Sequence, residues 1–395
     1  MKDEAASLLV VDDDEMNRDM LSRRLARRGF AVSVAKDGGE ALELAARQPF
    51  DLVLLDIMMP GIDGIEVLKR LRKNHTVADL PVIMATAKNT SDDLVRALEL
   101  GANDYVTKPL DFPVVLARVQ TQLSLKRAKA ELEAAHARMK KDLEAAARVQ
   151  QALMPQSLPD VEGAEFAWSF VPCDELAGDI LDIFRLDETK IGLYLLDVSG
   201  HGVPSALLSV TLSRLLSHLE DKPFLFEGAG DGASGRRLLP PSDVASRLNL
   251  RFPMDPETRQ YFTFAYGILD MDRLELRYVS AAHPGPIHLT SAAPTMVHPP
   301  TGLAIGWFPD ATYRESVITL KPGDRLYLCS DGILEAMSPE EEMFGPDRLV
   351  DSIEGARDDA LTDSIDKLLE AVREWCDVGG PGDDVSVLAV EIHNS

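Results

Sequence analysis

A short apolar run that ends in a single carboxylate constrains the fold of this chain more than any other feature. Leu52–Leu55 is followed directly by Asp56 and then by a turn-like stretch that includes Pro60 and Gly61. A run so apolar and so short is typical of a strand buried on both faces of a parallel sheet. Open α/β sheets bind ligands at the C-terminal ends of their strands, where this carboxylate lies. The alternative is a turn aspartate without chemistry.

Two further strand ends supply matching groups. The run Leu8–Val11 ends in Asp12 and Asp13, and the stretch Tyr105–Pro109 contains Lys108. Mg²⁺ is held by a few carboxylate oxygens, keeps several waters and bridges to phosphate oxygens. A lysine pairs with a phosphoryl group as a point charge. The three strand ends together predict a site for Mg²⁺ and a phosphoryl group.

The order of these residues over residues 1–121 resembles the receiver domain of bacterial response regulators. The residues that carry the resemblance are Asp12, Asp13, Asp56, Thr86 and Lys108. The resemblance implies a doubly wound α/β domain with a five-stranded parallel sheet. It also implies a sensor histidine kinase or a phosphotransfer protein as a partner.

The same resemblance implies roles for single residues. Asp56 would accept the phosphoryl group, and the backbone carbonyl of Met58 would help Asp12, Asp13 and Asp56 hold Mg²⁺. Lys108 would bind the phosphoryl group. Thr86 would move to the new oxygens and Tyr105 would change rotamer as the switch, although core packing alone also accounts for a buried tyrosine.

Length and charge set further bounds. With 395 residues the chain is long enough for two domains and a connector. The net charge is −24, and residues 155–395 hold 18 basic and 41 acidic residues. The phosphates of a nucleic acid would repel a region this acidic. We therefore expect no nucleic-acid partner. Three scattered cysteines suit a cytoplasmic protein, and no stretch is typical of a membrane span or a secretory signal.

Residues 122–154 predict a helical linker. The stretch 122–153 contains neither Pro nor Gly and is rich in helix-forming residues. Apolar residues recur every seven positions, at Leu125, Leu132, Met139, Ala146 and Leu153. The pattern resembles a weak two-stranded coiled coil, in which Asp142 interrupts the second seam. We therefore expect a homodimer through this helix; a single helix lying on one of the domains is the alternative.

Residues 155–395 predict an α+β domain. Strand-like runs follow one another with few helices between them, which indicates an antiparallel layered fold. Four acids each adjoin an apolar stretch and a turn residue: Asp179, Asp197, Asp331 and Asp383. Singly, each is an ordinary turn residue. Together they form an oxygen-rich set that suits hard cations such as Mg²⁺ and Mn²⁺.

Several segments of residues 146–392 resemble bacterial PPM (PP2C-type) serine/threonine phosphatases of the RsbU and SpoIIE class. The segments are 147–155, 177–182, 197–202, 280–286, 330–336 and 382–386. The resemblance implies a β-sandwich flanked by helices, with two Mn²⁺ or Mg²⁺ ions at one edge. Asp197 would bridge both ions, the carbonyl of Val198 would assist, and Asp179, Asp331 and Asp383 would complete the site.

Some residues near these segments have weaker assignments. Asp384 and Asp182 are candidates for an outer or additional metal position. We expect His201 to be structural, because it lies two positions later relative to Asp197 than the histidine of the eukaryotic PP2C motif, and we expect His283 to pack near the site. A metal-activated water makes a protein nucleophile unnecessary.

Three functions remain open. The first is a response regulator whose phosphorylation controls a protein phosphatase acting on a phosphorylated anti-sigma-factor antagonist. The second resembles RssB-type adaptors, which bind a stress sigma factor for proteolysis. The third is a small-molecule phosphatase. The kinase, the substrate, the choice between Mg²⁺ and Mn²⁺, and whether phosphorylation activates or inhibits do not follow from the sequence.

Overall fold

The computed structural model describes residues 5–87, 91–200, 202–216, 224–227, 237–255, 257, 259–291 and 294–393. Its packing divides the chain into two compact units, residues 1–139 and 140–395. This division falls inside the predicted linker. The domain boundaries at 121 and 154 therefore remain predictions.

The first unit is a doubly wound α/β domain, as the sequence predicted. Its five parallel strands have the order β2-β1-β3-β4-β5. The elements are β1 (Ser7–Val11), α1 (Glu15–Ala26), β2 (Ala31–Ala35), α2 (Gly38–Arg47), β3 (Leu52–Asp56), α3 (Gly64–Arg72), β4 (Val82–Ala87), α4 (Ser91–Glu99), β5 (Asp104–Lys108) and the start of α5 (Phe112–Gln151).

Each strand of this sheet contributes apolar side chains to both faces, which explains the uninterrupted apolar runs. On β1, Leu8 and Val10 pack with residues of α1 and α5, whereas Leu9 and Val11 pack with residues of α2 and α3. Successive side chains of a strand point to opposite faces, so one run serves two cores. The carboxyl ends of β1, β3 and β5 then lie at one edge.

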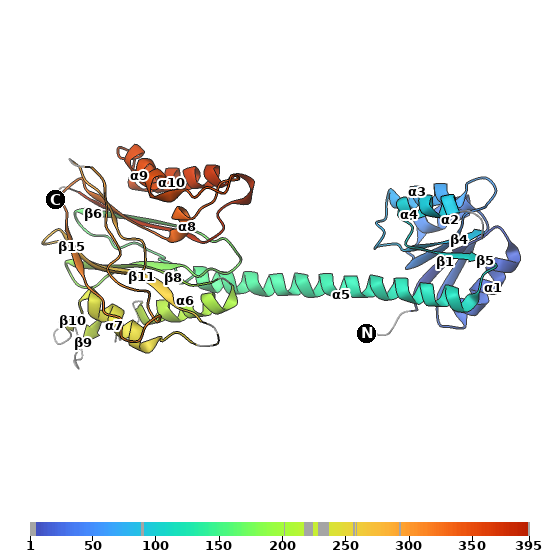
Figure 1. Cartoon of the computed structure of the whole chain (residues 1–395), viewed down its shortest axis with the longest axis horizontal. Coiled ribbons are helices and arrows are strands. Elements are labelled where there is room, and N and C mark those ends of the chain that lie inside the picture. The colour runs from blue at the N-terminus through green and yellow to red at the C-terminus, as the bar shows by residue number, and fades with distance from the viewer. Residues whose placement is uncertain are drawn as a thin grey trace. The chain divides into compact units, whose positions relative to one another are not determined.

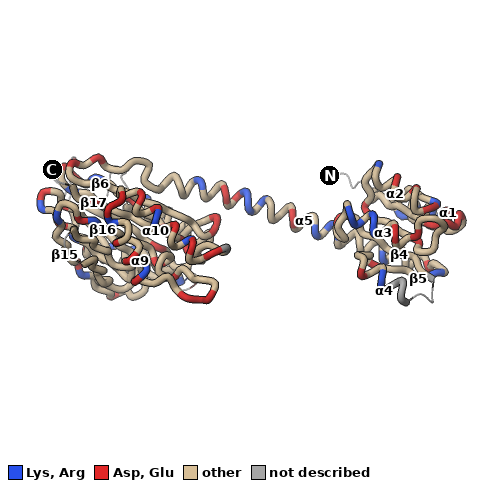
Figure 2. Tube along the Cα trace, turned by 90° about the horizontal axis from the view of Figure 1, so that it is seen from above, with Lys and Arg blue, Asp and Glu red and all other residues tan. Residues whose placement is uncertain are grey.

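The helix α5 continues without a break from the receiver into the predicted linker. Its first turns pack into the first unit through residues as far as Leu123, and Lys126 forms an ion pair of 3.0 Å with Asp51. Beyond that point Leu132 and Met139 are exposed, and basic and acidic residues alternate along the helix (Figure 2). Among the helices of the described residues, none combines the length and the apolar character needed to cross a membrane.

The second unit contains two antiparallel five-stranded sheets. The sheet orders are β15-β12-β11-β8-β7 and β14-β13-β16-β17-β6, and β9 pairs with β10. The strands are β6 (Ala164–Val171), β7 (Ile180–Arg185), β8 (Lys190–Val198), β9 (Phe226–Glu227), β10 (Arg237–Leu238), β11 (Phe262–Asp270), β12 (Glu275–Ala281), β13 (Ile287–Leu289), β14 (Met296–Val297), β15 (Ser316–Thr319), β16 (Arg325–Cys329) and β17 (Val385–Ile392).

The two sheets pack face to face, and helices cover both outer faces (Figure 1). One outer face carries α6 (Val203–Leu216) and α7 (Pro241–Arg251). The other carries α9 (Gly345–Gly355) and α10 (Leu361–Cys376), and the short α8 (Asp331–Leu334) follows β16. This is the β-sandwich flanked by helices that the sequence predicted.

The last turn of α5 is built into the second unit through Gln150, which is buried. The Gln150 amide nitrogen donates hydrogen bonds to the carbonyl of Ala177 at 2.6 Å and to the hydroxyl of Ser209 on α6 at 3.0 Å. The amide oxygen accepts one from the backbone N–H of Ala177 at 3.1 Å. One neutral side chain thereby binds the helix end to the segment before β7.

We expect Gln150→Ala to destabilise the second unit, because the buried backbone groups of Ala177 would lose their partner. Leaving such groups unsatisfied costs about 1–3 kcal/mol. The measurement is the free energy of unfolding by urea. Gln151→Ala, at the exposed neighbouring position, is the control and should change it little; equal effects of the two substitutions would contradict this role of Gln150.

Candidate functional site

The first candidate site lies at the carboxyl ends of β1, β3 and β5. Lys108 Nζ is 2.9 Å from Asp12 Oδ2 and 2.7 Å from Asp56 Oδ2. Carboxylate oxygens of Asp12, Asp13 and Asp56 lie within 4.8 Å of one another. These residues, far apart in the sequence, form one ion site because parallel strands end at the same edge.

Asp56 is buried at this edge and faces two opposing influences. Burial raises the pKa of the Asp56 carboxyl, and the hydrogen bond and charge of Lys108 only partly offset it. Burial alone would lower the pKa of Lys108, but its bonds to Asp56 and Asp12 raise it. The lysine therefore stays charged and holds the carboxylate in place.

The backbone beside Asp56 is closely packed. A Cβ atom at Gly64 would lie 2.1 Å from the carbonyl oxygen of Asp56, so the start of α3 requires glycine. The backbone N–H of Met58 is 3.4 Å from Asp56 Oδ1. The Met58 carbonyl was a predicted ligand, whereas the requirement for glycine at position 64 depends on a close backbone approach that no sequence pattern indicates.

The two predicted switch residues lie on adjacent strands. Thr86 is buried on β4, opposite Thr107 of β5 in the strand register. Tyr105 is half-buried on β5, and the guanidinium of Arg118 lies 5.9 Å from the centre of its ring. Their switch roles remain predictions.

The second candidate site lies at one edge of the two sheets of the second unit. Asp179 immediately precedes β7 and Asp197 lies near the end of β8, and these antiparallel strands pair Ile180 with Leu196. Asp331 follows β16 and Asp383 precedes β17, which are paired in the same way. The start of one antiparallel strand lies beside the end of the next, so the four acids converge.

The convergence produces strong repulsion between carboxylates. Burial, followed by the charge of Asp197, raises the pKa of Asp179 well above its ordinary value. Burial, followed by the charges of Asp331 and Asp383, raises the pKa of Asp197 to about 8. Burial and the charge of Asp383 likewise raise the pKa of Asp331. Like charges brought together in a partly desolvated site disfavour ionisation.

Three of these acids, Asp197, Asp331 and Asp383, line a cavity of about 620 Å³, here called the acidic cleft. Its lining residues are Cys173, Asp174, Asp197, Ser199, Gly200, Tyr261, Thr263, Asp331, Glu335, Pro381, Gly382 and Asp383. None of the described lining residues is a lysine or an arginine. A divalent cation fits this donor set, because hard cations select carboxylate oxygens and would neutralise their repulsion.

Two serines fix the geometry of the acids. Ser386 Oγ donates a hydrogen bond of 2.6 Å to Asp179 Oδ2. Ser330 Oγ donates to the carbonyl of Asp384 at 3.1 Å and accepts from the backbone N–H of Ser386 at 2.9 Å. Both serines are buried. The sequence motifs contained these serines, but the sequence analysis assigned them no role.

Asp384 is oriented mainly by backbone groups. Its Oδ1 accepts a hydrogen bond of 2.9 Å from the N–H of Cys173, and its Oδ2 accepts one of 2.7 Å from the N–H of Gly178. Asp384 therefore holds the segment that leads into Asp179. Its predicted contact with a metal remains a prediction. The Cys173 Sγ and one carboxylate oxygen each of Asp383 and Asp384 lie within 4.8 Å of one another, and burial and the charge of Asp384 raise the pKa of the Cys173 thiol to about 12.

Gly178 permits a close approach at the edge of the cleft. A Cβ atom there would lie 2.8 Å from the carbonyl oxygen of Val198 and 3.3 Å from Asp197 Oδ1. The Val198 carbonyl, a predicted ligand, thus lies on the same side of the chain as Asp197. The requirement for glycine at position 178 could not be inferred from the spacing of residues in the sequence either.

The remaining candidates are distributed differently. His283 is fully buried and its Nδ1 is 2.7 Å from the hydroxyl of Thr263, which lines the cleft. Burial lowers the pKa of His283 to about 3, so the ring is neutral. Asp182 lines another cavity, between β7 and the segment after α5. His201 lies outside the described residues.

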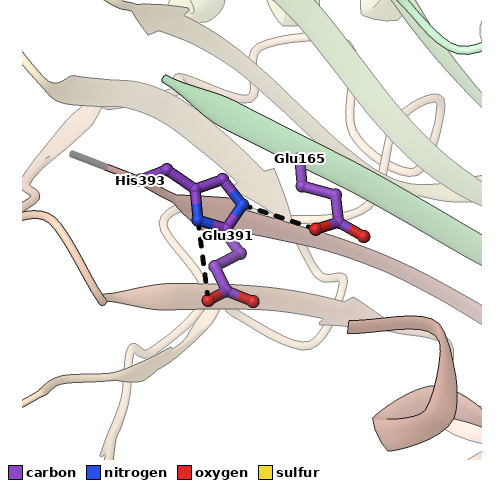
Figure 3. Close-up of side chains that lie close together, drawn as sticks. All are labelled: Glu165, Glu391 and His393. Atoms are coloured by element: carbon purple, nitrogen blue, oxygen red, sulfur yellow. Dashed lines mark hydrogen bonds and ion pairs between the residues drawn. The ribbon is translucent and has the colours of Figure 1, made fainter. Parts of the chain in front are cut away.

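A further cluster lies at the opposite end of β17 from Asp383. His393 Nε2 is 3.4 Å from Glu165 Oε2, and its Nδ1 is 4.0 Å from Glu391 Oε1 (Figure 3). Arg325 already pairs with the other oxygen of Glu391 at 2.8 Å. These contacts join β6, β16 and the end of β17.

Two family models match the chain. The model of Stage II sporulation protein E (SpoIIE) matches residues 187–393, more than half of the chain. The chain belongs to the SpoIIE family. The model of the response regulator receiver domain matches residues 8–120. Both resemblances drawn from the sequence are thereby confirmed.

Individual relatives cover parts of the chain. YkoG of Bacillus subtilis (strain 168), an uncharacterized transcriptional regulatory protein, is 43% identical over 120 residues, which are 30% of this chain and 52% of YkoG. The chain thus spans about half the length of this curated relative.

Two solved structures resemble the second unit. The SiaA-PP2C domain of Pseudomonas aeruginosa matches with a TM-score of 0.54 at 21% identity, covering 66% of this chain and 99% of that domain. The PP2C phosphatase domain and a regulatory fragment of SpoIIE from Bacillus subtilis match with a TM-score of 0.48 at 18% identity, over 59% of this chain and 64% of that one. The SiaA match shows that the second unit has the PP2C-type fold.

We expect Gly178→Ala to disturb the acidic cleft, because the new methyl group would meet the Val198 carbonyl and the Asp197 carboxylate. Gly382→Ala is the matched control, since a Cβ atom there meets nothing within 4 Å. The measurement is the rise in melting temperature on adding Mn²⁺, which Gly178→Ala should diminish and Gly382→Ala should preserve. An undiminished rise in Gly178→Ala would show that the close approach is unimportant.

Proposed function

We propose that this chain is a response regulator in which phosphorylation of Asp56 controls a metal-dependent protein serine/threonine phosphatase. The observation that carries the proposal is the convergence of Asp179, Asp197, Asp331 and Asp383 without a basic residue among the described lining of the acidic cleft. Such a cluster is costly to form in a fold unless a cation completes it.

The cleft would hold two Mn²⁺ or Mg²⁺ ions. Asp197 would contact both, and Asp179, Asp331, Asp383 and the carbonyl of Val198 would supply further oxygens. When bound, such a pair lowers the pKa of a shared water and offsets charge on phosphoryl oxygens. The protein's part is to hold the carboxylates: Ser386 orients Asp179, and the N–H of Asp384 donates a hydrogen bond of 2.8 Å to Asp383 Oδ1.

Ser199 has a positional role in this proposal and is no nucleophile. Its hydroxyl oxygen accepts a hydrogen bond of 3.0 Å from the N–H of Tyr261, and its own N–H donates to the Tyr261 carbonyl at 2.9 Å. These bonds tie the loop after β8 to the start of β11. These bonds thereby hold two walls of the cleft together where a substrate phosphate would enter.

Control would pass through α5. Gln150 binds both backbone groups of Ala177, two residues before Asp179. A displacement of the last turn of α5 would therefore act on the segment that carries a predicted metal ligand. The exposed residues Leu125, Leu132 and Met139, spaced seven apart, would join two copies of this helix in a dimer.

The partners follow from the two families. A sensor histidine kinase or a phosphotransfer protein would phosphorylate Asp56, with Mg²⁺ held by Asp12, Asp13, Asp56 and the Met58 carbonyl. By analogy with the RsbU and SpoIIE class, the substrate would be a phosphorylated anti-sigma-factor antagonist. An adaptor that only binds a sigma factor would not need the acidic cleft to bind metal, so the next experiment also separates these two functions.

We expect Asp331→Asn to have opposite effects on stability without and with metal. In EDTA the substitution removes a repulsive charge from carboxyls with raised pKa values, so the melting temperature should rise, by roughly 2–4 °C for each kcal/mol of relieved repulsion. With Mn²⁺ the wild type should gain stability by ligand binding and the variant should not. Hydrolysis of p-nitrophenyl phosphate should be lost.

The control for this experiment is Asp272→Asn, at an exposed position in the turn after β11. It should follow the wild type in all three measurements. Full metal stabilisation and activity in Asp331→Asn would overturn the assignment of the cleft.

We expect Asp56→Asn to remove the effect of a phosphodonor on phosphatase activity, because the amide cannot accept the phosphoryl group. The measurement is p-nitrophenyl phosphate hydrolysis with and without acetyl phosphate in the presence of Mg²⁺. Glu43→Gln, an exposed position on α2, is the control and should keep the response. A response that survives in Asp56→Asn would exclude control through this residue.

A further inference from the structure

A row of aromatic side chains begins in the acidic cleft and leads outward. Tyr261, which lines the cleft, stacks on Trp307 with ring centres 5.3 Å apart and planes at 11°. Trp307 stacks on Phe308 at 5.6 Å and 25°. Trp307 is 45% and Phe308 50% exposed. Two large exposed aromatic residues side by side are unusual on a surface without a binding role.

The loop that carries this aromatic row is held rigidly. Asn249 of α7 accepts a hydrogen bond from the N–H of Gly306 at 2.8 Å and donates to the carbonyls of Phe308 and Pro309 at 2.9 and 3.2 Å. The N–H of Met254 donates to the Gly306 carbonyl at 2.9 Å.

Two further features fix the course of this loop. Ile305 and Phe262 exchange two backbone hydrogen bonds, of 2.9 and 3.2 Å. Gly306 has a φ of +91°, and a Cβ there would lie 2.5 Å from the carbonyl oxygen of Phe252. Trp307 and Phe308 are thus presented outward by a preorganised backbone, and binding to them would require little ordering of the loop.

We propose that the aromatic row of Tyr261, Trp307 and Phe308 is a docking surface for the protein substrate, and that it binds an apolar side chain of that substrate. The inference rests on the proposed phosphatase function and adds a determinant of substrate choice. Continuity with the cleft favours this occupant, because Tyr261 lines the cleft and a chain that leaves the cleft on this side would meet Trp307 and Phe308 next.

The dimensions of the row require a substrate larger than a phosphorylated amino acid. An extended chain advances roughly 3.3–3.6 Å per residue. The two ring-to-ring steps of 5.3 and 5.6 Å therefore correspond to about three residues of substrate beyond the rim of the cleft. Exposed aromatic residues in a rigid setting are the residues that most often dominate binding energy at protein interfaces.

The experiment compares a small ester with peptides. The peptide probes are short phosphoserine peptides of glycine and serine in which a single leucine occupies each position in turn. With the wild-type chain and Mn²⁺, leucine at one or more positions should raise kcat/KM. In Trp307→Ala this advantage should fall roughly ten-fold, whereas Trp307→Phe should retain much of it. Hydrolysis of p-nitrophenyl phosphate should be the same in all three proteins.

Val317→Ala, at an exposed apolar position on β15, is the matched control and should keep the leucine preference. Three results would overturn the proposal: no leucine preference in the wild type, a preference that survives in Trp307→Ala, or an equal loss of ester and peptide hydrolysis.

A binding measurement separates this inference from the proposed function. The fluorescence of Trp307 should shift to shorter wavelength when a leucine-containing phosphopeptide binds, and the shift should be absent in Trp307→Phe. Absence of ester hydrolysis in the wild type would overturn the phosphatase function, and the fluorescence shift would still decide whether the row binds peptide. Absence of the shift with active enzyme would overturn the docking surface alone.

Discussion

Repulsion between carboxylates at one edge of two sheets is the constraint on which the second unit depends. Four separate strand ends bring acids together where burial already disfavours their charge. Closely packed groups hold this arrangement in place: two buried serines, the carboxylate of Asp384 and the backbone of Gly178. Hydrogen bonds that hold like-charged carboxylates close together are typical of a site that a cation completes.

The first unit meets a related problem with a residue of its own. There Lys108 lies between Asp12 and Asp56 and supplies a positive charge from within the chain. Among the described residues that line the acidic cleft, no lysine or arginine does the same. The two sites therefore differ in how their charge is balanced: the first contains a counter-charge from the chain, and the described lining of the second contains none.

Much of this architecture was predictable from the sequence because it rests on local patterns. Apolar runs predicted the strands β1 and β3, strand-like runs predicted the antiparallel second domain, and the acids beside these runs are the ones that the fold brings together. The stretch without Pro or Gly predicted the helix, although α5 starts earlier, at Phe112, because it is also the last helix of the receiver. These features depend on residues that are close in the chain or at strand ends.

What the sequence did not predict depends on contacts between distant segments. Gly64 and Gly178 matter because a carbonyl from another segment approaches them. Tyr261 and Trp307 stack although 46 positions separate them, and their row follows no sequence period. Asp182 belongs to the same sequence motif as Asp179, yet it lines another cavity. It lies three positions further along the chain, inside β7, and side chains an odd number of positions apart on a strand point to opposite faces.

The bonds of Gln150 have a consequence for how firmly the end of α5 is attached to the second unit. An ion pair at the surface weakens as salt increases, because mobile ions screen it. The bonds from Gln150 to Ala177 and Ser209 join uncharged, buried groups, so neither ionic strength nor ordinary acidity alters them. The end of α5 is therefore seated on the second unit in the same way in dilute and in concentrated salt.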